Sequence, residues 1–475
     1  MRLFEILIIL ANTVSVINLV FVRQEKILLV LLPAAVLLCI TALILEKYRG
    51  QMLPAYGLSV VLLVIDTINR FSRPDIPVDF TGGFEMAILL LVLAISVAWP
   101  LMFPVINLPE PGGKYPVGTM RMAFTDKTRS GIFTAPEVYR KLAVQVWYPA
   151  ERVTDIKALD YFPDRKVGKY MAKRARLPNI FGQLALVKTN SYPEAALSSG
   201  EMRYPVLLFS AGYGGFGGQN TLQMEELASH GYVVFSIFHT YEDFASIFPD
   251  GEIIPCSMGQ IKAFQDELIK FAKGSKNSNT REFYNHVMDN SRVVGNSVKI
   301  WTDDTVFTAD QIEKLESGEI KSIFGGRLDT SRLGVFGHSF GGAAAGQVCL
   351  NDARFKAFIN MDGTPFGDTI RNILSQPFML LNTGKYDHSA GYCPEQKNYL
   401  NVSVKGARHA DFMDYILLYP VLKHVGFLGS IDGRRLVRIV NDYVLSFFNR
   451  HLKGMKEPLA DGMLEKYPEV TVKIR

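Results

Sequence analysis

The first 109 residues consist of four long apolar runs separated by short breaks that hold most of the charged side chains. Each run approaches the ~20 residues that a helix needs to cross ~30 Å of hydrocarbon. No small-x-small cleavage pattern follows the first run, and three more apolar runs come directly after it. Both observations argue against a cleaved signal peptide. The pattern predicts an all-α transmembrane region over 1–109. Its four predicted helices span about residues 3–22, 27–45, 52–68 and 86–106.

From residue 110 onward, short runs rich in β-branched and aromatic residues alternate with helical stretches. This alternation is typical of an α/β domain with a mostly parallel sheet. Several runs are apolar on both faces, as expected of strands covered by helices on both sides. We predict one α/β domain over 110–475, with its chemistry at the carboxyl ends of the strands. The predicted strands are 142–148, 206–210, 232–238, 333–336, 357–361, 378–381 and 400–404, and a closing helix is predicted over 434–452.

Composition and charge narrow the function classes. The chain has 475 residues, 48% of them hydrophobic, and a formal net charge of +5. These values exclude a disordered or collagen-like chain and leave no dense basic footprint for nucleic acid. Lys and Arg are equally frequent on the two sides of the predicted spans, so the membrane side of the C-terminal domain stays open. The four cysteines are too scattered to indicate a metal site, and we expect no metal, no organic cofactor and no nucleic acid partner.

The strongest chemical signal is the segment 337–341, Gly-His-Ser-Phe-Gly, which follows a predicted strand and precedes a helix that starts with small residues. A Gly-x-Ser-x-Gly segment in this setting is typical of a nucleophile elbow. Its glycines allow the strand and the helix to pack closely around a strained turn that lifts the serine Oγ into a cleft. The helix N-terminus also favours developing negative charge. Ser339 is therefore the candidate nucleophile.

A serine nucleophile needs a base, and the base needs an orienting acid. His409 follows the last predicted strand, which fits the chain order Ser, Asp, His of this kind of site. Two carboxylates compete for the third role: Asp362 ends the strand 357–361, and Asp387 follows the strand 378–381. Spacing alone does not choose between them, because either strand end can face His409.

An oxyanion hole is expected from the backbone N–H of Phe340 and from a second N–H in the glycine-rich loop 211–218. The same loop contains Gly212-x-Gly214-x-x-Gly217, which is formally a dinucleotide-binding fingerprint. The next predicted strand does not end in the acidic residue that would hold a ribose. A nucleotide-binding function would also leave the serine and histidine motifs unexplained, so we do not favour it.

The segment 327–342 resembles the platelet-activating factor acetylhydrolase family of α/β-hydrolases. The likeness covers most of residues 112–455 and leaves the predicted spans outside it. Further matching segments are Pro205–Ser210, Leu227–Tyr232, Phe358–Asp362, Gln376–Phe378, and His409 with Asp411 and Phe412.

The resemblance implies an α/β-hydrolase fold and calcium-independent cleavage of short or oxidised acyl chains from phospholipids. It also implies that Asp362 rather than Asp387 is the acid, and that Tyr213 supplies the second oxyanion donor. The chain departs from the family at Ala211-Gly212, where the family usually has His-Gly. Backbone donors survive such a side-chain change.

The sequence thus predicts an integral multi-pass protein of a cell membrane that hydrolyses esters through a Ser-His-Asp triad and an acyl-enzyme. Its expected partners are membrane lipid and an ester substrate, in the first place a phospholipid. Two alternatives stay open. One is a broad-specificity carboxylesterase acting on small or polymeric esters, and the other is a catalytically silent interaction module with a hydrolase fold.

Overall fold

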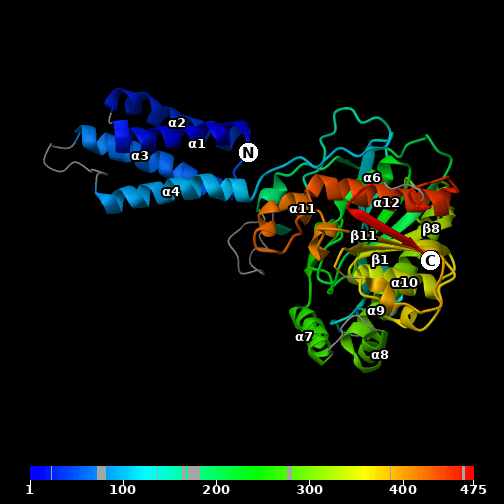
Figure 1. Ribbon diagram of the computed structural model, residues 1–475. Coiled ribbons are helices and arrows are strands. Elements are labelled where there is room, and N and C mark those ends of the chain that lie inside the picture. Colours follow the sequence, from blue (N-terminus) through cyan, green and yellow to red (C-terminus); the bar gives the residue numbers. More distant parts are fainter. Residues whose placement is uncertain are drawn as a thin grey trace. The chain divides into compact units, whose positions relative to one another are not determined.

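The computed structural model describes the chain except for residues 23, 72–81, 136, 163–166, 169–181, 275–280, 386 and 463–465. The described chain forms two compact units, and Figure 1 labels several of their helices and strands. Unit 1 consists of Met1–Asn107, Asp160–Lys188 and Leu418–Val421. Unit 2 consists of Leu108–Leu159, Thr189–Leu417 and Leu422–Arg475.

Unit 1 is built on four long apolar helices that run beside one another (Figure 1). Each helical segment is long and apolar enough to cross a membrane. The four predicted apolar helices are therefore present, with ends shifted by a few residues. They are α1 (Leu3–Ile17, continued by a π-helical turn over Asn18–Val22), α2 (Glu25–Leu45), α3 (Leu53–Phe71, preceded by a 3₁₀ turn over Gly50–Met52) and α4 (Gly83–Met102).

Polar groups lie inside this helix bundle. The fully buried Arg49 guanidinium lies 2.7 Å from the Glu5 carboxylate and donates to the carbonyl of Pro100 at 2.8 Å. Asn12 of α1 donates to the carbonyl of Ala55 in α3 at 2.9 Å. Such interhelical hydrogen bonds are common between membrane helices, where packing and polar contacts drive association. Large apolar side chains face outward instead, and examples are Val30, Leu37 and Ile44, which are 64–73% exposed.

Unit 2 is organised around one sheet, which in the described part of the chain has ten strands in the order β12-β11-β10-β9-β8-β4-β5-β2-β1-β3. The six central strands pair in parallel, whereas β2 and β12 join them antiparallel. The predicted mostly parallel sheet is confirmed. The strands are β1 (Val117–Ser130), β2 (Tyr139–Pro149), β3 (Ser191–Pro193), β4 (Tyr204–Ser210), β5 (Val233–Phe238), β8 (Leu328–His338), β9 (Phe355–Met361), β10 (Phe378–Thr383), β11 (Tyr399–Val404) and β12 (Val470–Ile474), beside a small hairpin of β6 (Ala245–Ile247) and β7 (Ile253–Pro255).

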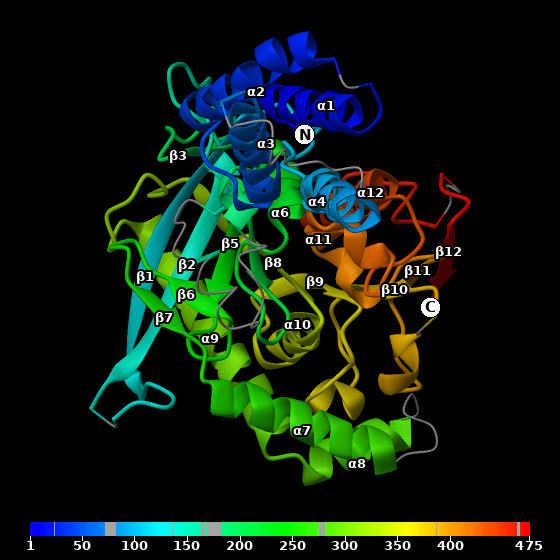
Figure 2. The ribbon, with the colours of Figure 1, turned by 90° about the vertical axis from the view of Figure 1, so that its left-hand side faces the viewer.

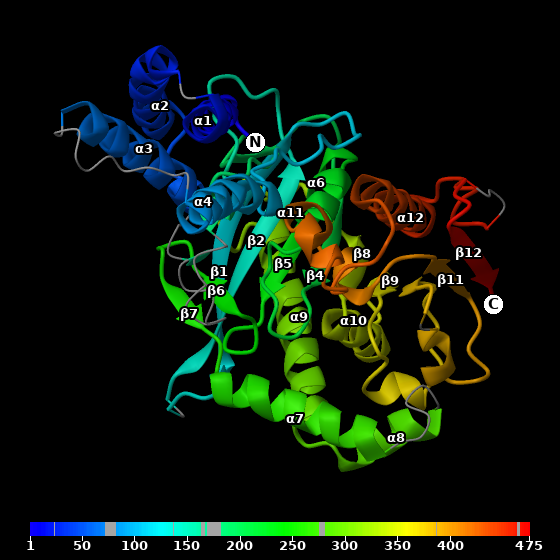
Figure 3. The ribbon, with the colours of Figure 1, turned by 60° about the vertical axis from the view of Figure 1, so that its left-hand side comes forward.

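Helices cover both faces of this sheet (Figure 2; Figure 3). The helices α6 (Thr221–Ser229) and α12 (Gly433–Lys453) pack together on one face. On the other face, α9 (Val293–Ser317) and α10 (Phe340–Asn351) pack together, and α7 (Met258–Gly274) contacts α9. Coverage on both faces explains why the central strands β4 and β5 are buried at every position. The remaining helices of unit 2 are α8 (Arg281–Asn290) and the short α11 (Tyr415–Leu418).

All seven predicted strands are present, within a few residues of their expected ends. The pattern missed β1, because polar and charged residues interrupt its apolar positions and only five of its fourteen residues are buried. The carboxyl ends of β4, β8, β9, β10 and β11 meet at one edge of the sheet, since these strands are parallel. That edge holds the candidate residues.

Candidate active site

Ser339 stands in a strained turn between β8 and α10. Its φ of 57° and ψ of −122° are rare for a residue with a side chain, and such strain clusters at functional turns. The flanking glycines are required by close packing. A Cβ on Gly337 would lie 2.2 Å from the carbonyl carbon of Gly341, and a Cβ on Gly341 would lie 2.1 Å from the carbonyl oxygen of Ser210. The local sequence therefore builds a nucleophile elbow.

Three predicted side chains form one hydrogen-bonded chain. The Ser339 Oγ lies 2.9 Å from the His409 Nε2, and the His409 Nδ1 lies 2.7 Å from the Asp362 Oδ2. His409 begins a 3₁₀ turn after β11, and its side chain is 52% exposed, whereas that of Asp362 is 2% exposed. Because the carboxylate can only accept, His409 carries its proton on Nδ1, and its Nε2 is free to accept the serine proton. This arrangement suits nucleophilic catalysis by serine.

The Asp362 carboxylate is kept ionised despite its burial. Burial acts to raise its pKa, but hydrogen bonds and charges from His388 and His409 outweigh that effect and hold the pKa well below its ordinary value. Its Oδ1 accepts the backbone N–H of Thr383 at 2.9 Å. Its own N–H donates to the carbonyl of Leu381 at 2.8 Å, which fixes the strand end against β10. The acid is therefore held by both its side chain and its backbone.

Asp387, the other candidate acid, serves the turn after β10. Its Oδ1 accepts the N–H of Ser389 at 3.0 Å and the Asn401 side chain at 2.9 Å, and Lys473 lies 3.8 Å from its Oδ2. The turn that Asp387 caps carries the buried His388, whose Nε2 lies 3.5 Å from the Asp362 Oδ1. Sequence reasoning missed His388. The only available signal was its position at the end of a predicted strand.

His338, inside the elbow, braces the loop that carries His409. Its Nε2 lies 3.0 Å from the His409 carbonyl oxygen, and its Nδ1 lies 3.2 Å from the Gln219 side-chain nitrogen. Burial, with a smaller effect from the His409 charge, lowers the pKa of His338 to about 3. A neutral ring with its proton on Nε2 satisfies both contacts. His338 thus fixes the backbone of His409 without carrying charge.

The predicted oxyanion donors lie on two segments that pack around the elbow. Within the described chain, neither the backbone N–H of Phe340 nor that of Tyr213 donates to a protein acceptor. A Cβ on Gly212 would lie 3.2 Å from the Cβ of Ser339, so the glycine-rich loop passes directly beside the nucleophile. The Tyr213 ring stacks on Phe264 with centroids 3.7 Å apart and meets the Phe340 ring edge-on at 5.3 Å.

Glu242 holds the glycine-rich loop in place through hydrogen bonds to Tyr213 and Gly214. Its carboxylate accepts from the Tyr213 hydroxyl at 3.0 Å, from Ser297 at 2.6 Å and from the Trp301 ring N–H at 2.8 Å. Its backbone carbonyl accepts the N–H of Gly214 at 3.0 Å. The carboxylate that follows the glycine-rich fingerprint is therefore used within the protein, which gives the dinucleotide interpretation no support.

A fully buried network of charged and polar side chains contacts Ser210, the last residue of β4. Arg140 binds both carboxylate oxygens of Asp304, and the His239 Nδ1 lies 3.0 Å from the Asp304 Oδ2. The His239 Nε2 lies 3.0 Å from the Ser210 Oγ. Burial lowers the pKa of His239, so its ring is neutral near pH 7. Ser210, His239 and Asp304 thus form a second Ser-His-Asp chain. Ser210 is only 2% exposed, however, and Asp304 is paired with Arg140. The network holds the strand from which the glycine-rich loop starts.

No cluster of three or more metal-ligating side chains occurs among the residues that the structure describes. The Ser339–His409 and His409–Asp362 distances match those expected between a nucleophile, a base and an acid in a serine-dependent acyl-transfer site.

Comparisons with known proteins identify the family of the chain. The family described as "Platelet-activating factor acetylhydrolase, isoform II" matches residues 102–462. The platelet-activating factor acetylhydrolase of Canis lupus familiaris is 24% identical over 381 residues, which cover 74% of this chain and 78% of the relative. The "Probable 1-alkyl-2-acetylglycerophosphocholine esterase" of Arthroderma benhamiae is 24% identical over 432 residues, which cover 80% of this chain and 96% of the relative.

A solved structure extends the likeness to the fold. The ferulic acid esterase from Streptomyces cinnamoneus superposes with a TM-score of 0.59 at 26% identity and covers 78% of this chain and 99% of its own. The predicted α/β-hydrolase fold is thus confirmed. With a family match that spans most of the sequence, the chain belongs to the platelet-activating factor acetylhydrolase isoform II family and is a serine ester hydrolase.

Proposed function

We propose that the protein is a membrane-bound hydrolase that cleaves short or oxidised acyl esters of phospholipids through a triad of Ser339, His409 and Asp362. The observation that carries the proposal is the continuous hydrogen-bonded chain from the Ser339 Oγ to the His409 ring at 2.9 Å and on to the Asp362 carboxylate at 2.7 Å. The acyl and lipid specificity is supported by the names of the relatives, an acetylhydrolase and an acetylglycerophosphocholine esterase.

In the proposed reaction, the Ser339 Oγ attacks the ester carbonyl carbon while its proton moves to the His409 Nε2. The backbone N–H groups of Phe340 and Tyr213 stabilise the oxyanion. His409 then returns the proton to the departing alcohol, which leaves an acyl group on Ser339. Water, deprotonated by the same histidine, attacks the acyl-enzyme and releases the carboxylic acid. Asp362 stabilises the charged imidazole in each step.

Membrane attachment through α1, α2, α3 and α4 is the second part of the proposal. The support is the arrangement of unit 1, in which buried ionic and amide groups are paired inside and large apolar side chains are exposed outside. A protein surrounded by water avoids such a large exposed apolar surface. A membrane location would also place the enzyme beside lipid substrates.

A chain-length series tests this function. The full chain in detergent micelles is assayed on p-nitrophenyl esters from acetate to palmitate, together with Ser339→Ala and a matched control, Ser375→Ala, at an exposed serine. We expect turnover that falls steeply beyond short chains, is lost in Ser339→Ala and is kept in Ser375→Ala, and a fluorophosphonate adduct on the Ser339 peptide. No turnover and no adduct would favour the silent interaction module.

The likeness to a ferulic acid esterase keeps a broad-specificity carboxylesterase as the second candidate. The same series separates the two. Comparable kcat/KM values across the whole series, and on aryl esters without a phosphate, would favour the carboxylesterase.

A further inference from the structure

Two turns at the carboxyl edge of the sheet are joined by backbone hydrogen bonds. One is the glycine-rich loop after β4, and the other is the turn 239–244 after β5, the parallel neighbour of β4. The N–H of Gly214 donates to the carbonyl of Glu242 at 3.0 Å, and the N–H of Phe244 donates to the carbonyl of Gly215 at 2.6 Å. The turn after β5 therefore supports the loop along its backbone.

The Glu242 carboxylate makes a second connection between this turn and the loop. It is fully buried and accepts from the Tyr213 hydroxyl at 3.0 Å. It also accepts from Ser297 at 2.6 Å and from the Trp301 ring N–H at 2.8 Å, both on α9, and from Gln260 of α7 at 3.4 Å. One residue thus holds the loop through both its backbone and its side chain and joins the loop to two helices.

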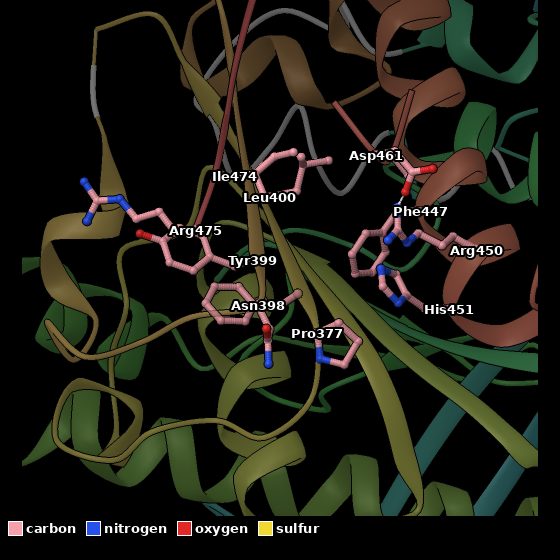
Figure 4. Close-up of a pocket in the computed structure, with 12 residues that line it drawn as sticks. Pro377, Asn398, Tyr399, Leu400, Phe447, Arg450, His451, Asp461, Ile474 and Arg475 are labelled. Carbon is pink, nitrogen blue, oxygen red and sulfur yellow. Dashed lines mark ion pairs between the residues drawn. The ribbon is translucent and has the colours of Figure 1, made fainter. Parts of the chain in front are cut away.

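The hydrogen bonds to the Glu242 carboxylate come from uncharged donors, whereas other carboxylates of this unit are paired with arginine. Asp304 binds Arg140. Asp461, which lines a cavity of about 450 Å³ where β10 and β11 begin, is ion-paired with Arg450, as the dashed line in Figure 4 marks. Burial of a charge is costly, and apolar side chains of similar volume are often as stabilising. Stability alone therefore gives no reason for a carboxylate at position 242.

The Tyr213 ring belongs to an aromatic cluster that also contains the Phe340 ring. Tyr213 stacks on Phe264 with centroids 3.7 Å apart and on Trp301 with centroids 5.9 Å apart. The Phe340 ring meets these three rings edge-on, at centroid distances of 5.0–5.3 Å. The two residues whose backbone N–H groups are the proposed oxyanion donors therefore have side chains that pack against each other.

We propose that Glu242 is a positioning residue for the oxyanion hole, because its carboxylate holds the Tyr213 hydroxyl and thereby fixes the Tyr213 backbone N–H. This inference rests on the proposed function, in which that N–H is the second oxyanion donor. Tyr213 lies between Gly212 and Gly214, and glycine restrains the backbone less than any other residue. The Tyr213 side chain is therefore the anchor that orients this N–H. Donors fixed before the charge develops stabilise the transition state most effectively.

The test compares an oxygen ester with its sulfur analogue. The full-length protein in detergent is assayed on p-nitrophenyl acetate and on the corresponding thionoester, in which sulfur replaces the carbonyl oxygen. Sulfur is a weak hydrogen-bond acceptor, so turnover of the thionoester depends less on the oxyanion donors. The ratio of kcat for the oxygen ester to kcat for the thionoester therefore reports on the oxyanion hole and does not change with the amount of folded enzyme.

Loss of the Glu242 carboxylate should weaken the oxyanion hole. We expect Glu242→Ala to lower kcat for the oxygen ester about 30-fold with KM within about twofold, because a displaced donor loses part of the 10²–10³-fold that one oxyanion donor contributes. The oxygen-to-sulfur ratio should fall about tenfold. Tyr213→Phe removes the same hydrogen bond from the other side and should lower the ratio by a similar factor. In the Tyr213→Phe background, Glu242→Ala should lower the ratio little further, since both changes act through one contact.

Glu242→Gln is the conservative variant. The glutamine amide can accept from the Trp301 ring N–H and donate to the hydroxyl oxygens of Tyr213 and Ser297, so it keeps the connection to the loop without the charge. We expect the oxygen-to-sulfur ratio to fall less than about threefold in this variant.

The matched control is Glu225→Ala, which also removes a buried carboxylate. Glu225 of α6 is 1% exposed and accepts from the N–H of Asn190 at 2.6 Å and from the Ser191 hydroxyl at 2.6 Å, outside the glycine-rich loop. We expect this variant to unfold at a lower temperature and to keep the wild-type ratio. A ratio that falls equally in Glu225→Ala would show that general destabilisation, and not the oxyanion hole, is being measured, and would overturn the proposal.

The two proposals fail in different ways. If the wild-type protein shows no Ser339-dependent turnover of either ester, the proposed function fails and the positioning role fails with it. If Ser339-dependent turnover is present but Tyr213→Phe and Glu242→Ala keep the wild-type ratio, only the role of Glu242 fails. Thermal unfolding checks the fold of each variant, and Tyr213→Phe with Glu242→Gln decides the question if Glu242→Ala does not fold.

Discussion

Replacing Asp362 with Asn tests which carboxylate orients His409, the proposed catalytic base. The Asp362 Oδ1 accepts the N–H of Thr383 at 2.9 Å, and the Oδ2 accepts from the His409 Nδ1 at 2.7 Å. An asparagine at this position keeps its carbonyl oxygen on Thr383, because that partner can only donate. Its NH₂ group then faces the His409 Nδ1 and forces the ring proton onto Nε2. A histidine in that form cannot accept the serine proton.

The expected loss follows from this tautomer change. Loss of the orienting acid in a serine triad lowers kcat by about 10⁴-fold, which corresponds to about 5.4 kcal/mol in the activation free energy. Asp387→Asn is the matched control. Both protein hydrogen bonds of Asp387 end on its Oδ1, so an asparagine keeps them and loses only the 3.8 Å contact with Lys473. We expect a change in kcat of less than about fivefold, since exposed ion pairs contribute less than about 1 kcal/mol.

The assay is kcat for p-nitrophenyl acetate near pH 7.5, with thermal unfolding as a check on the fold and fluorophosphonate labelling to count competent serines. If Asp387→Asn lowers kcat more than Asp362→Asn while both variants stay folded, the assignment of the acid is wrong. An Asp362→Asn enzyme with wild-type kcat would refute the tautomer argument itself.

Three further results are expected. His388→Gln should lower kcat about fivefold with little change in KM, because the 3.5 Å contact between His388 and Asp362 is long and worth about 1 kcal/mol. If His388→Gln has the same effect in the Asp362→Asn background, His388 does not act by positioning Asp362. In pH-dependent urea unfolding, the depressed pKa of Asp362 implies a stabilisation that is complete above its ordinary value of 3.8 and is lost as the pH falls through the folded-state pKa. The difference in the free energy of unfolding between wild type and Asp362→Asn should therefore narrow below about pH 4. A difference that is constant with pH would show that the Asp362 carboxylate does not stabilise the fold in this way. Arg140→Met leaves the buried Asp304 with one charge partner, the partly exposed Arg129 at 3.0 Å, and should cost about 3 kcal/mol in urea unfolding, the lower end of the range for breaking a buried ion pair. An unchanged midpoint would show that the network does not stabilise the fold.

Features that depend on neighbouring residues could be predicted from the amino-acid sequence alone. Four apolar runs of membrane-spanning length became α1 to α4, because an apolar helix needs only its own periodicity and length to be recognised. The nucleophile elbow around Ser339 could also be recognised from adjacent residues, since the close contacts of Gly337 and Gly341 follow from a tight turn between a strand and a helix.

Contacts between residues of distant segments could not be predicted in this way and became known from the fold. It placed Asp362 rather than Asp387 beside His409, and it turned the segment after Asp387 so that His388 reaches the same carboxylate. It also brought Glu242, which follows β5, against Tyr213, which follows β4. The physical reason is that these contacts are set by the order and register of parallel strands, which are decided by packing across the whole sheet and leave no periodic signal in the sequence.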